Sequence, residues 1–176
     1  MEIIETNFKG LKIYKKKTYV DKRGYTRELF NNRYFKKKFP FDLISLSKKN
    51  VIRGLHLQTK KPQAKFITVL SGKIFDVAVD CRIKSKTFGE YFSFILSENK
   101  NESLYIPEGF AHGYYVISET AEISYKCSEI YQREEENGII WNDPDIAIEW
   151  PGYAPILSER DHALPLLKSF NESTNT

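Results

Sequence analysis

The sequence predicts an all-β protein, either a sandwich or a barrel. From residue 51 onward, short runs rich in Ile, Val, Phe and Tyr alternate with turn signals that contain Gly, Pro, Asn or Asp. Their spacing of roughly 8–12 residues is typical of these two architectures. The aromatic content, 14% with 12 Phe and 11 Tyr, agrees with this class, because aromatic rings fit a pleated, half-buried surface.

The elements follow in order along the chain. The one candidate for a helix before residue 51 is Thr26–Lys37, which is short and charged. The predicted strands are Lys65–Leu70, Ile74–Val79, Tyr91–Leu96, Leu104–Ile106, Gly113–Ile117 and Glu122–Tyr125. A short helix is expected within Leu157–Lys168, and the tail after about residue 168 is expected to be frayed. With no internal repeat or linker, residues 1–176 are expected to form a single domain.

Composition narrows the class of protein. The chain has 176 residues, 41% of them hydrophobic and 28% charged, as in ordinary globular proteins. No apolar run approaches the roughly 20 residues of a membrane helix, and the first residues lack the pattern of a signal peptide. We therefore expect a cytoplasmic protein without a membrane partner, in which Cys81 and Cys127 stay free of a disulfide framework.

The net charge of +4 comes largely from short lysine runs. These runs lack the interleaved aromatic residues of a single-strand binder. We interpret them as a solvated face and do not expect a nucleic-acid partner. A small anionic ligand also suits this charge, because the positive field would attract it.

The three histidines, His56, His112 and His162, are the first candidates for chemistry. His56 lies in RGLHLQ and His112 in PEGFAHGYY, while His162 is interpreted as a surface residue. No His-x-His, HExxH or CxxC spacing is present, so a metal site is not expected. His56 and His112 could still be polar residues that are satisfied by hydrogen bonds and have no catalytic role.

Four other residues favour a catalytic reading. Asp76 and Asp161 are candidate carboxylates to orient a histidine base, since a carboxylate fixes the tautomer of its imidazole. Lys65 and Tyr125 supply a cation and a phenol from other predicted strands. Such a set suits proton abstraction next to a carbonyl group, provided that the fold brings its members together.

Several longer motifs carry a resemblance to a known family. They are KKNVIRGLHLQ, QAKFITVLSGKIFDVAVDCR, SKTFGEYFSFILS, LYIPEGFAHGYYVISETAEISYKCSE, WNDPDIAIEWP and ILSERDHALPLL. In this order, from about residue 19 to residue 167, they resemble the dTDP-4-dehydrorhamnose 3,5-epimerase family of nucleotide-sugar epimerases. RGLHxQ and IPEGFAHG together make the resemblance highly specific.

The resemblance implies a cupin-type β-barrel (jelly roll) with a few short helices that works as a homodimer without a metal or other cofactor. It implies proton abstraction at C3 and C5 of a dTDP-4-keto-6-deoxy sugar, followed by reprotonation from the opposite face. On this resemblance His56 matches the base, Asp161 its carboxylate partner, Lys65 the family's lysine and Tyr125 the opposing acid.

The remaining residues implied by the resemblance bind substrate. His112 is the second pocket histidine with Asp76 as its partner, Arg53 is expected on the diphosphate, and Gln58 belongs to the same motif as Arg53. Arg23 and Glu28 match an N-terminal segment that is exchanged in the dimer and reaches into the neighbouring subunit's site.

The sequence departs from the family pattern at two places. Phe41-Asp42-Leu43 stands where the family usually has a Gln-x-Asn element, and Ile130-Tyr131 stands where it often has two tyrosines. Both departures fall on ligand recognition and leave the reacting groups intact. The alternatives therefore remain a 3-epimerase or related isomerase that acts on another nucleotide-linked 4-keto sugar, and a non-catalytic sugar-binding cupin.

Overall fold

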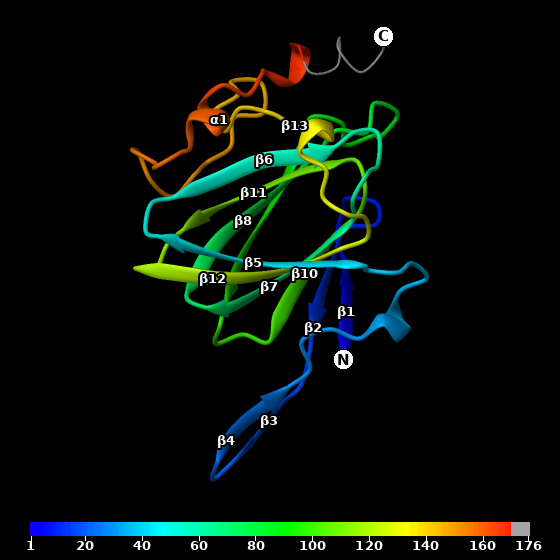
Figure 1. Ribbon diagram of the computed structural model, residues 1–176, viewed down its shortest axis with the longest axis vertical. Helices are drawn as coiled ribbons and strands as arrows, with labels where there is room; N and C mark the ends of the chain where they lie inside the picture. Colours follow the sequence, from blue (N-terminus) through cyan, green and yellow to red (C-terminus); the bar gives the residue numbers. More distant parts are fainter. Residues whose placement is uncertain (170–176) are drawn as a thin grey trace.

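The computed structural model describes residues 1–169 and consists mainly of β-strands (Figure 1). The strands are β1 Glu2–Glu5, β2 Lys12–Lys15, β3 Thr18–Asp21, β4 Gly24–Arg27, β5 Phe41–Lys48, β6 Ile52–Gln58, β7 Lys65–Ser71, β8 Lys73–Asp80, β9 Tyr91–Ser97, β10 Glu102–Ile106, β11 Phe110–Val116, β12 Thr120–Cys127 and β13 Glu136–Gly138. The helical elements are the 3₁₀ turns η1 Asn32–Tyr34 and η2 Arg133–Glu135 and the helix α1 Glu159–His162. The all-β prediction is confirmed.

Two antiparallel sheets form the body of the molecule. The first has the order β1-β2-β10-β7-β12-β5 and the second the order β13-β6-β11-β8-β9. The main core lies where the two sheets face each other, with Ile67 of β7 and Leu104 of β10 packed in one cluster with Ile74 of β8 and Leu96 of β9. All four side chains are fully buried, and burial of such side chains is the dominant favourable term in folding.

The second sheet is buried on both faces. Leu55 of β6 and Val77 of β8 belong to a second cluster, which Ile139, Ile146 and Leu167 of the C-terminal segment complete. Every residue of β11 is buried, as expected for a strand covered on both sides. The C-terminal segment, orange and red in Figure 1, thus lies over one face of this sheet.

The predicted helix at Thr26–Lys37 is wrong. β4 ends at Arg27, and only the three residues of η1 are helical. The aromatic spacing explains the difference. Phe30 stacks on Phe35 at 5.2 Å between ring centroids, and both rings pack edge-on against Phe66 of β7. An extended chain can place both rings on the sheet, whereas residues five apart do not share a helix face.

The C-terminal part of the chain agrees more closely with expectation. Within the predicted Leu157–Lys168 helix, α1 covers four residues and is capped by Ser158, whose Oγ accepts a hydrogen bond from the Asp161 N–H. Of the tail expected to be frayed after about residue 168, residues 170–176 lie outside the described residues.

The β3–β4 hairpin stands apart from both sheets and projects from the body (Figure 1). Its Tyr19, Val20 and Tyr25 side chains are exposed. Within residues 1–169, no helix is long and apolar enough to cross a membrane.

Candidate active site

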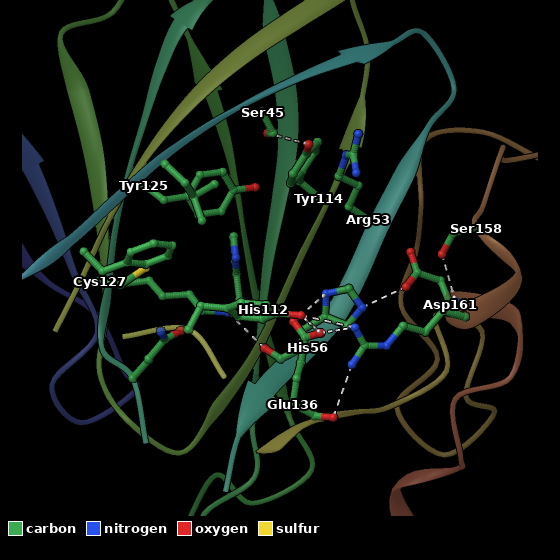
Figure 2. Close-up of a pocket in the computed structure, with 16 residues that line it drawn as sticks. Ser45, Arg53, His56, His112, Tyr114, Tyr125, Cys127, Glu136, Ser158 and Asp161 are labelled. Carbon is green, nitrogen blue, oxygen red and sulfur yellow. Dashed lines mark hydrogen bonds and ion pairs between the residues drawn. The ribbon is translucent and has the colours of Figure 1, made fainter. Parts of the chain in front are cut away.

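A cavity of about 320 Å³ opens between the two sheets (Figure 2). Six of the residues predicted for the site line it: Arg53, His56, Lys65, His112, Tyr125 and Asp161. β7 and β12 of the first sheet supply Lys65 and Tyr125, and β6 and β11 of the second supply Arg53, His56 and His112. Residues that are distant in sequence therefore meet in one space.

An irregularity in β6 orients the side chains of Arg53 and His56. His56 pairs with His112 and Arg53 pairs with Tyr114, so two residues of β6, Gly54 and Leu55, lie opposite a single residue of β11. Side chains of a regular strand alternate between faces, so residues three apart would point in opposite directions. The extra residue of this β-bulge turns Arg53 and His56 into the same cavity.

His56 bonds to a buried carboxylate. Its Nε2 lies 2.8 Å from Asp161 Oδ1, and the Asp161 side chain is only 5% exposed. Burial alone raises the pKa of Asp161, but hydrogen bonds and charge from His56, with further bonds from the Gly54 backbone and Ser158, outweigh it and lower the pKa below its usual value. Asp161 is therefore held as a carboxylate that orients the imidazole.

A second carboxylate faces the other ring nitrogen of His56. Glu136 Oε1 of β13 lies 3.7 Å from His56 Nδ1. The same carboxylate forms an ion pair with Arg160 and accepts a hydrogen bond from Tyr131 at 3.0 Å (Figure 2). Glu136 and Arg160 are site residues that the sequence did not predict; the one available signal was that Arg160 immediately precedes Asp161. Tyr131 lies at a position already assigned to ligand recognition by the family pattern.

Lys65 and Tyr125 are provided by the facing sheet. Lys65 Nζ donates to the backbone carbonyl of His56 at 3.2 Å. Burial lowers the pKa of Lys65, although Cys127, Glu136 and Asp76 oppose the shift. Burial raises the pKa of Tyr125 well above its usual value, so its phenol holds a proton that it can donate.

His112 and Asp76 form a buried pair beside these groups. His112 Nε2 lies 3.0 Å from Asp76 Oδ2, and the two side chains are 3% and 0% exposed. Burial lowers the pKa of His112 and raises that of Asp76, more strongly than their mutual attraction opposes. His112 also packs edge-on against the Tyr125 ring at 6.0 Å. Asp76 therefore supports His112 from behind and does not itself line the cavity.

Three predicted substrate-binding residues lie elsewhere. Gln58 differs from expectation, because its amide bonds to backbone groups of Lys61, Ile130 and Gln132 and does not line this cavity. Gln58 therefore connects the loop that contains Lys61 with the segment that contains Ile130 and Gln132. Arg23 pairs with Asp21 in the β3–β4 hairpin, and Glu28 accepts from Asn31.

The positions that depart from the family pattern lie at the cavity wall. Phe41 and Leu43 of β5 line it, while Asp42 points outward and pairs with Lys126 at 2.5 Å. Ile130 is exposed and Tyr131 lines the cavity. His162 is exposed on α1, as predicted. Within residues 1–169, no group of three or more His, Cys, Asp or Glu side chains is placed to hold a metal ion.

The arrangement suits the removal of a proton and the return of another. A histidine backed by a carboxylate is a general base, a phenol on a second sheet is a general acid, and a buried ammonium can stabilise a developing oxyanion. The exposed Arg53 guanidinium adds a fixed cation that matches phosphate groups.

Comparison with known proteins agrees with this geometry. A family model described as dTDP-4-dehydrorhamnose 3,5-epimerase matches residues 5–169. The dTDP-4-dehydrorhamnose 3,5-epimerase of Salmonella typhimurium is 43% identical over 175 residues, which cover 95% of this chain and 96% of that protein.

Two solved structures are also similar to this chain. The 3,5-epimerase of Legionella pneumophila, in complex with dTDP-4-keto-L-rhamnose, matches with a TM-score of 0.95 and 42% identity over 98% of this chain and 96% of that one. A 3′-monoepimerase of Streptomyces bikiniensis, in complex with dTDP-quinovose, matches with a TM-score of 0.87 and 26% identity over 98% and 97%. The match covers both sheets, and the prediction of a cupin-type barrel is confirmed.

Proposed function

Because this chain belongs to the dTDP-4-dehydrorhamnose 3,5-epimerase family, we propose that it inverts C3 and C5 of a dTDP-4-keto-6-deoxyhexose, as in dTDP-L-rhamnose-type deoxysugar biosynthesis. The protein is an isomerase of the epimerase class. The observation that carries the proposal is the placement of His56 with Asp161 and Tyr125 in one cavity, on strands of opposite sheets, with Lys65 beside His56.

Each inversion exchanges one proton for another. Neutral His56 takes the proton from the carbon next to the ketone, and the electrons of the C–H bond delocalise onto the keto oxygen as an enolate. Asp161 stabilises the imidazolium that forms. Tyr125 then donates its phenolic proton to the opposite face of the carbon, and the carbonyl group is restored with inverted configuration.

A general base alone does not account for the acceleration that an enzyme achieves. A positioned general base contributes roughly 10²–10⁴-fold, which is less than most enzymic accelerations. A donor aimed at the enolate oxygen supplies about 3–4 kcal/mol more. Lys65 is proposed for this role, because its ammonium is buried next to the base, and His112 is proposed to assist it.

Substrate binding is proposed to involve Arg53 and a second copy of the chain. Arg53 would hold the diphosphate. The projecting β3–β4 hairpin and the segment after it carry Arg23 and Glu28 away from this cavity, which fits a homodimer in which they enter the partner's site. The proposal places the whole chain in one domain that acts in the cytoplasm without a cofactor.

The test is hydrogen exchange in deuterium oxide. Incubation with dTDP-4-keto-6-deoxyglucose should put deuterium at C3 and C5, whereas His56→Ala and Tyr125→Phe should each lower the rate of doubly inverted product by at least about 10²-fold. Exchange at neither carbon would rule the function out. Exchange at one carbon only would select the alternative, a 3-epimerase or related isomerase, and unchanged activity in His56→Ala would show that His56 is not the base.

Light scattering tests the assembly. We expect the mass of a dimer in solution, and Arg23→Ala should raise KM for the sugar nucleotide while kcat changes little. A monomeric protein with full activity would contradict the shared site.

A further inference from the structure

The lining of the cavity is polar except at one corner. Among the described residues that line it, those without a strong hydrogen-bonding group in the side chain are Phe41, Leu43 and Cys127. The three are neighbours in the first sheet, because Phe41 of β5 lies opposite Cys127 of β12 and Leu43 follows two residues along β5. These three side chains are called the apolar corner below.

The alternation of β5 presents the corner to the cavity. Phe41 and Leu43 line the cavity, whereas Asp42 and Ile44 are exposed on the opposite face of the strand, as the period of two of a β-strand requires. Cys127 is 2% exposed, and burial raises the pKa of its thiol to about 11. The thiol is therefore uncharged and only a weak hydrogen-bonding group. A polar group placed against this corner loses water and gains no strong hydrogen bond in return.

The apolar corner adjoins the proposed acid and the proposed oxyanion donor. Leu43 lies opposite Tyr125 in the pairing of β5 with β12, and Cys127 lies opposite Lys65 in the pairing of β12 with β7. Side chains directly opposite each other in an antiparallel pair are close enough to share one contact partner. Because Tyr125 and Lys65 must reach the reacting carbon and the keto oxygen, the corner faces the sugar.

The corner also lies away from the proposed diphosphate site. Arg53 Nε donates to Ser47 Oγ at 2.8 Å, and four residues of β5 between Ser47 and Leu43 span roughly 13 Å. Figure 2 shows Tyr125 and Cys127 on one side of the cavity and Arg53 on the other. The diphosphate is attached at C1, so the corner meets the opposite end of the ring. The methyl group of thymine lies beyond the diphosphate and does not reach it.

At that end of a 4-keto-6-deoxyhexose the keto carbon has two different neighbours. C3 carries a hydroxyl group, and C5 carries the C6 methyl group, which is the apolar substituent of the ring. We propose that Phe41, Leu43 and Cys127 hold the C6 methyl group and make the site select a 6-deoxy sugar over its 6-hydroxy counterpart. The inference rests on the proposed function and deepens it, because it also orients the ring with C5 on the β5 side of the keto group.

The selectivity has a physical limit. A hydroxyl group on C6 would be buried against a phenyl ring, an isobutyl group and a thiol, and burial without a hydrogen-bond partner is unfavourable. Apolar pockets reject a ligand that only adds a hydroxyl group by up to about 100-fold. Lys65 does not relieve the loss, since its ammonium donates to the His56 carbonyl and is assigned to the keto oxygen.

Calorimetric titration with dTDP-6-deoxyglucose and with dTDP-glucose tests the proposal. The two ligands differ only in the oxygen on C6, and neither carries the ketone, so binding is measured without turnover. We expect the wild-type protein to bind dTDP-6-deoxyglucose at least about tenfold more tightly than dTDP-glucose. Equal affinities would overturn the proposal.

Leu43→Asn tests the corner itself, because it keeps nearly the same size and supplies an amide that can bond to the added hydroxyl group. The affinity ratio should fall below about threefold, chiefly because dTDP-glucose binds more tightly once its hydroxyl group has a partner. Phe41→Gln is the second variant, for use if Leu43→Asn does not fold, and should shift the ratio in the same direction.

The next residue along β5 provides the matched control. Ile44 is 60% exposed and does not line the cavity, so Ile44→Asn makes a similar chemical change on the outer face of the same strand. It should keep the wild-type affinity ratio.

An unchanged ratio in a folded Leu43→Asn or Phe41→Gln protein would show that these side chains do not select the sugar. Failure of the proposed function would look different, since the wild-type protein would then place no deuterium at C3 or C5 of the keto sugar, whatever the affinity ratio.

Discussion

Each ring nitrogen of His56 faces a carboxylate. Asp161 lies 2.8 Å from Nε2, and Glu136 lies 3.7 Å from Nδ1. The bond to Asp161 places the proton of the neutral ring on Nε2 and leaves Nδ1 free to accept another. Glu136 is thus next to the nitrogen that would become protonated, where its charge favours the imidazolium.

We expect Glu136→Gln to lower kcat/KM about tenfold, the effect of roughly 1.4 kcal/mol at the transition state. The carboxylate of Glu136 stabilises the imidazolium that forms when Nδ1 takes up the proton, and the neutral amide does not.

The measurement is kcat/KM of the variant and the wild type under the same conditions. Glu134→Gln serves as the control, since Glu134 is exposed in η2 and does not line the cavity. A Glu136→Gln protein with the wild-type kcat/KM would show that Glu136 serves Arg160 and Tyr131 alone.

The proposed reacting groups could be selected from the sequence, because each is a residue type with a specific chemistry. His56, Lys65 and Tyr125 could be singled out, and the structure brings them together. Glu136 could not be selected from the sequence, because a glutamate among several carries no signal of its own. Its importance depends on which neighbours the folded strands bring near.

Steric crowding explains why the β6 bulge contains a glycine. Gly54 has φ +126°, and a Cβ there would lie 2.5 Å from the Cα of Gly113. β6 and β11 therefore approach more closely than side chains allow. The consequence is functional, since this bulge turns Arg53 and His56 toward the same cavity.

Gly54→Ala should lower the free energy of unfolding by about 3 kcal/mol or more, because backbone strain and overlap add. Gly24→Ala is the matched control. Gly24 has a similar φ of +129° but nothing within 4 Å of its would-be Cβ, so only the strain of about 1 kcal/mol remains. Chemical denaturation measures both values. Equal losses in the two variants would refute the close approach as the cause.

The elements themselves were predicted unevenly. Strands with continuous apolar runs, such as β8, were located from sequence within a residue or two. β5 was not predicted. It is an edge strand in which the apolar side chains of Ile44 and Leu46 are exposed, so the alternation of apolar and polar residues along it does not match the alternation of buried and exposed positions. The false helix at Thr26–Lys37 arose because its phenylalanines serve an aromatic cluster on β7 that only the tertiary structure defines.

At the scale of the molecule, the active cavity depends on the whole barrel. One sheet provides Tyr125, the proposed acid, and Lys65, and the other provides His56 and His112. The C-terminal segment returns over the second sheet to supply Asp161, and buried Asp143 holds it there by accepting from the Leu167 N–H at 2.7 Å. Loosening this segment would remove the partner of His56 without any change in the sheets.

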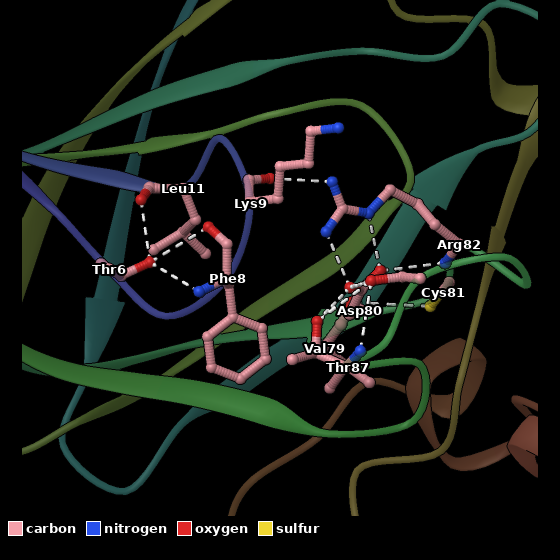
Figure 3. Close-up of polar contacts among 10 residues, drawn as sticks. Thr6, Phe8, Lys9, Leu11, Val79, Asp80, Cys81, Arg82 and Thr87 are labelled. Carbon is pink, nitrogen blue, oxygen red and sulfur yellow. Dashed lines mark hydrogen bonds and ion pairs between the residues drawn. The ribbon is translucent and has the colours of Figure 1, made fainter.

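A second buried carboxylate secures the loop that follows β8 (Figure 3). Asp80 accepts hydrogen bonds from Arg82 Nε at 2.8 Å, Arg82 Nη2 at 2.7 Å, Ser85 at 2.6 Å and Thr87 at 2.7 Å. The Arg82 guanidinium also donates to the Lys9 carbonyl and lies 4.4 Å from the centroid of the Phe110 ring. The cluster thereby joins the start of the chain to the second sheet.

Asp80 should make the stability of the molecule depend on acid pH. Burial raises the pKa of Asp80, but the hydrogen bonds from Arg82, Ser85 and Thr87 outweigh it, and the pKa lies below its usual value of 3.8. A carboxyl group with a lowered pKa in the folded state stabilises the protein fully above its unfolded pKa and ceases to do so as the pH falls through the folded value. The contribution is therefore complete at neutral pH and disappears below pH 3.8.

We expect Asp80→Asn to lower the free energy of unfolding at pH 7 by about 2 kcal/mol, the scale of a charge-assisted hydrogen bond. Its difference from the wild type should shrink as the pH falls below the usual carboxyl range, because the wild-type carboxylate is then protonated and as neutral as the amide. Denaturation midpoints at several pH values measure the effect. Asp42→Asn is the control, since Asp42 is exposed and its pair with Lys126 contributes little. A difference that persisted unchanged into strong acid would show that Asp80 acts through packing rather than through its charge.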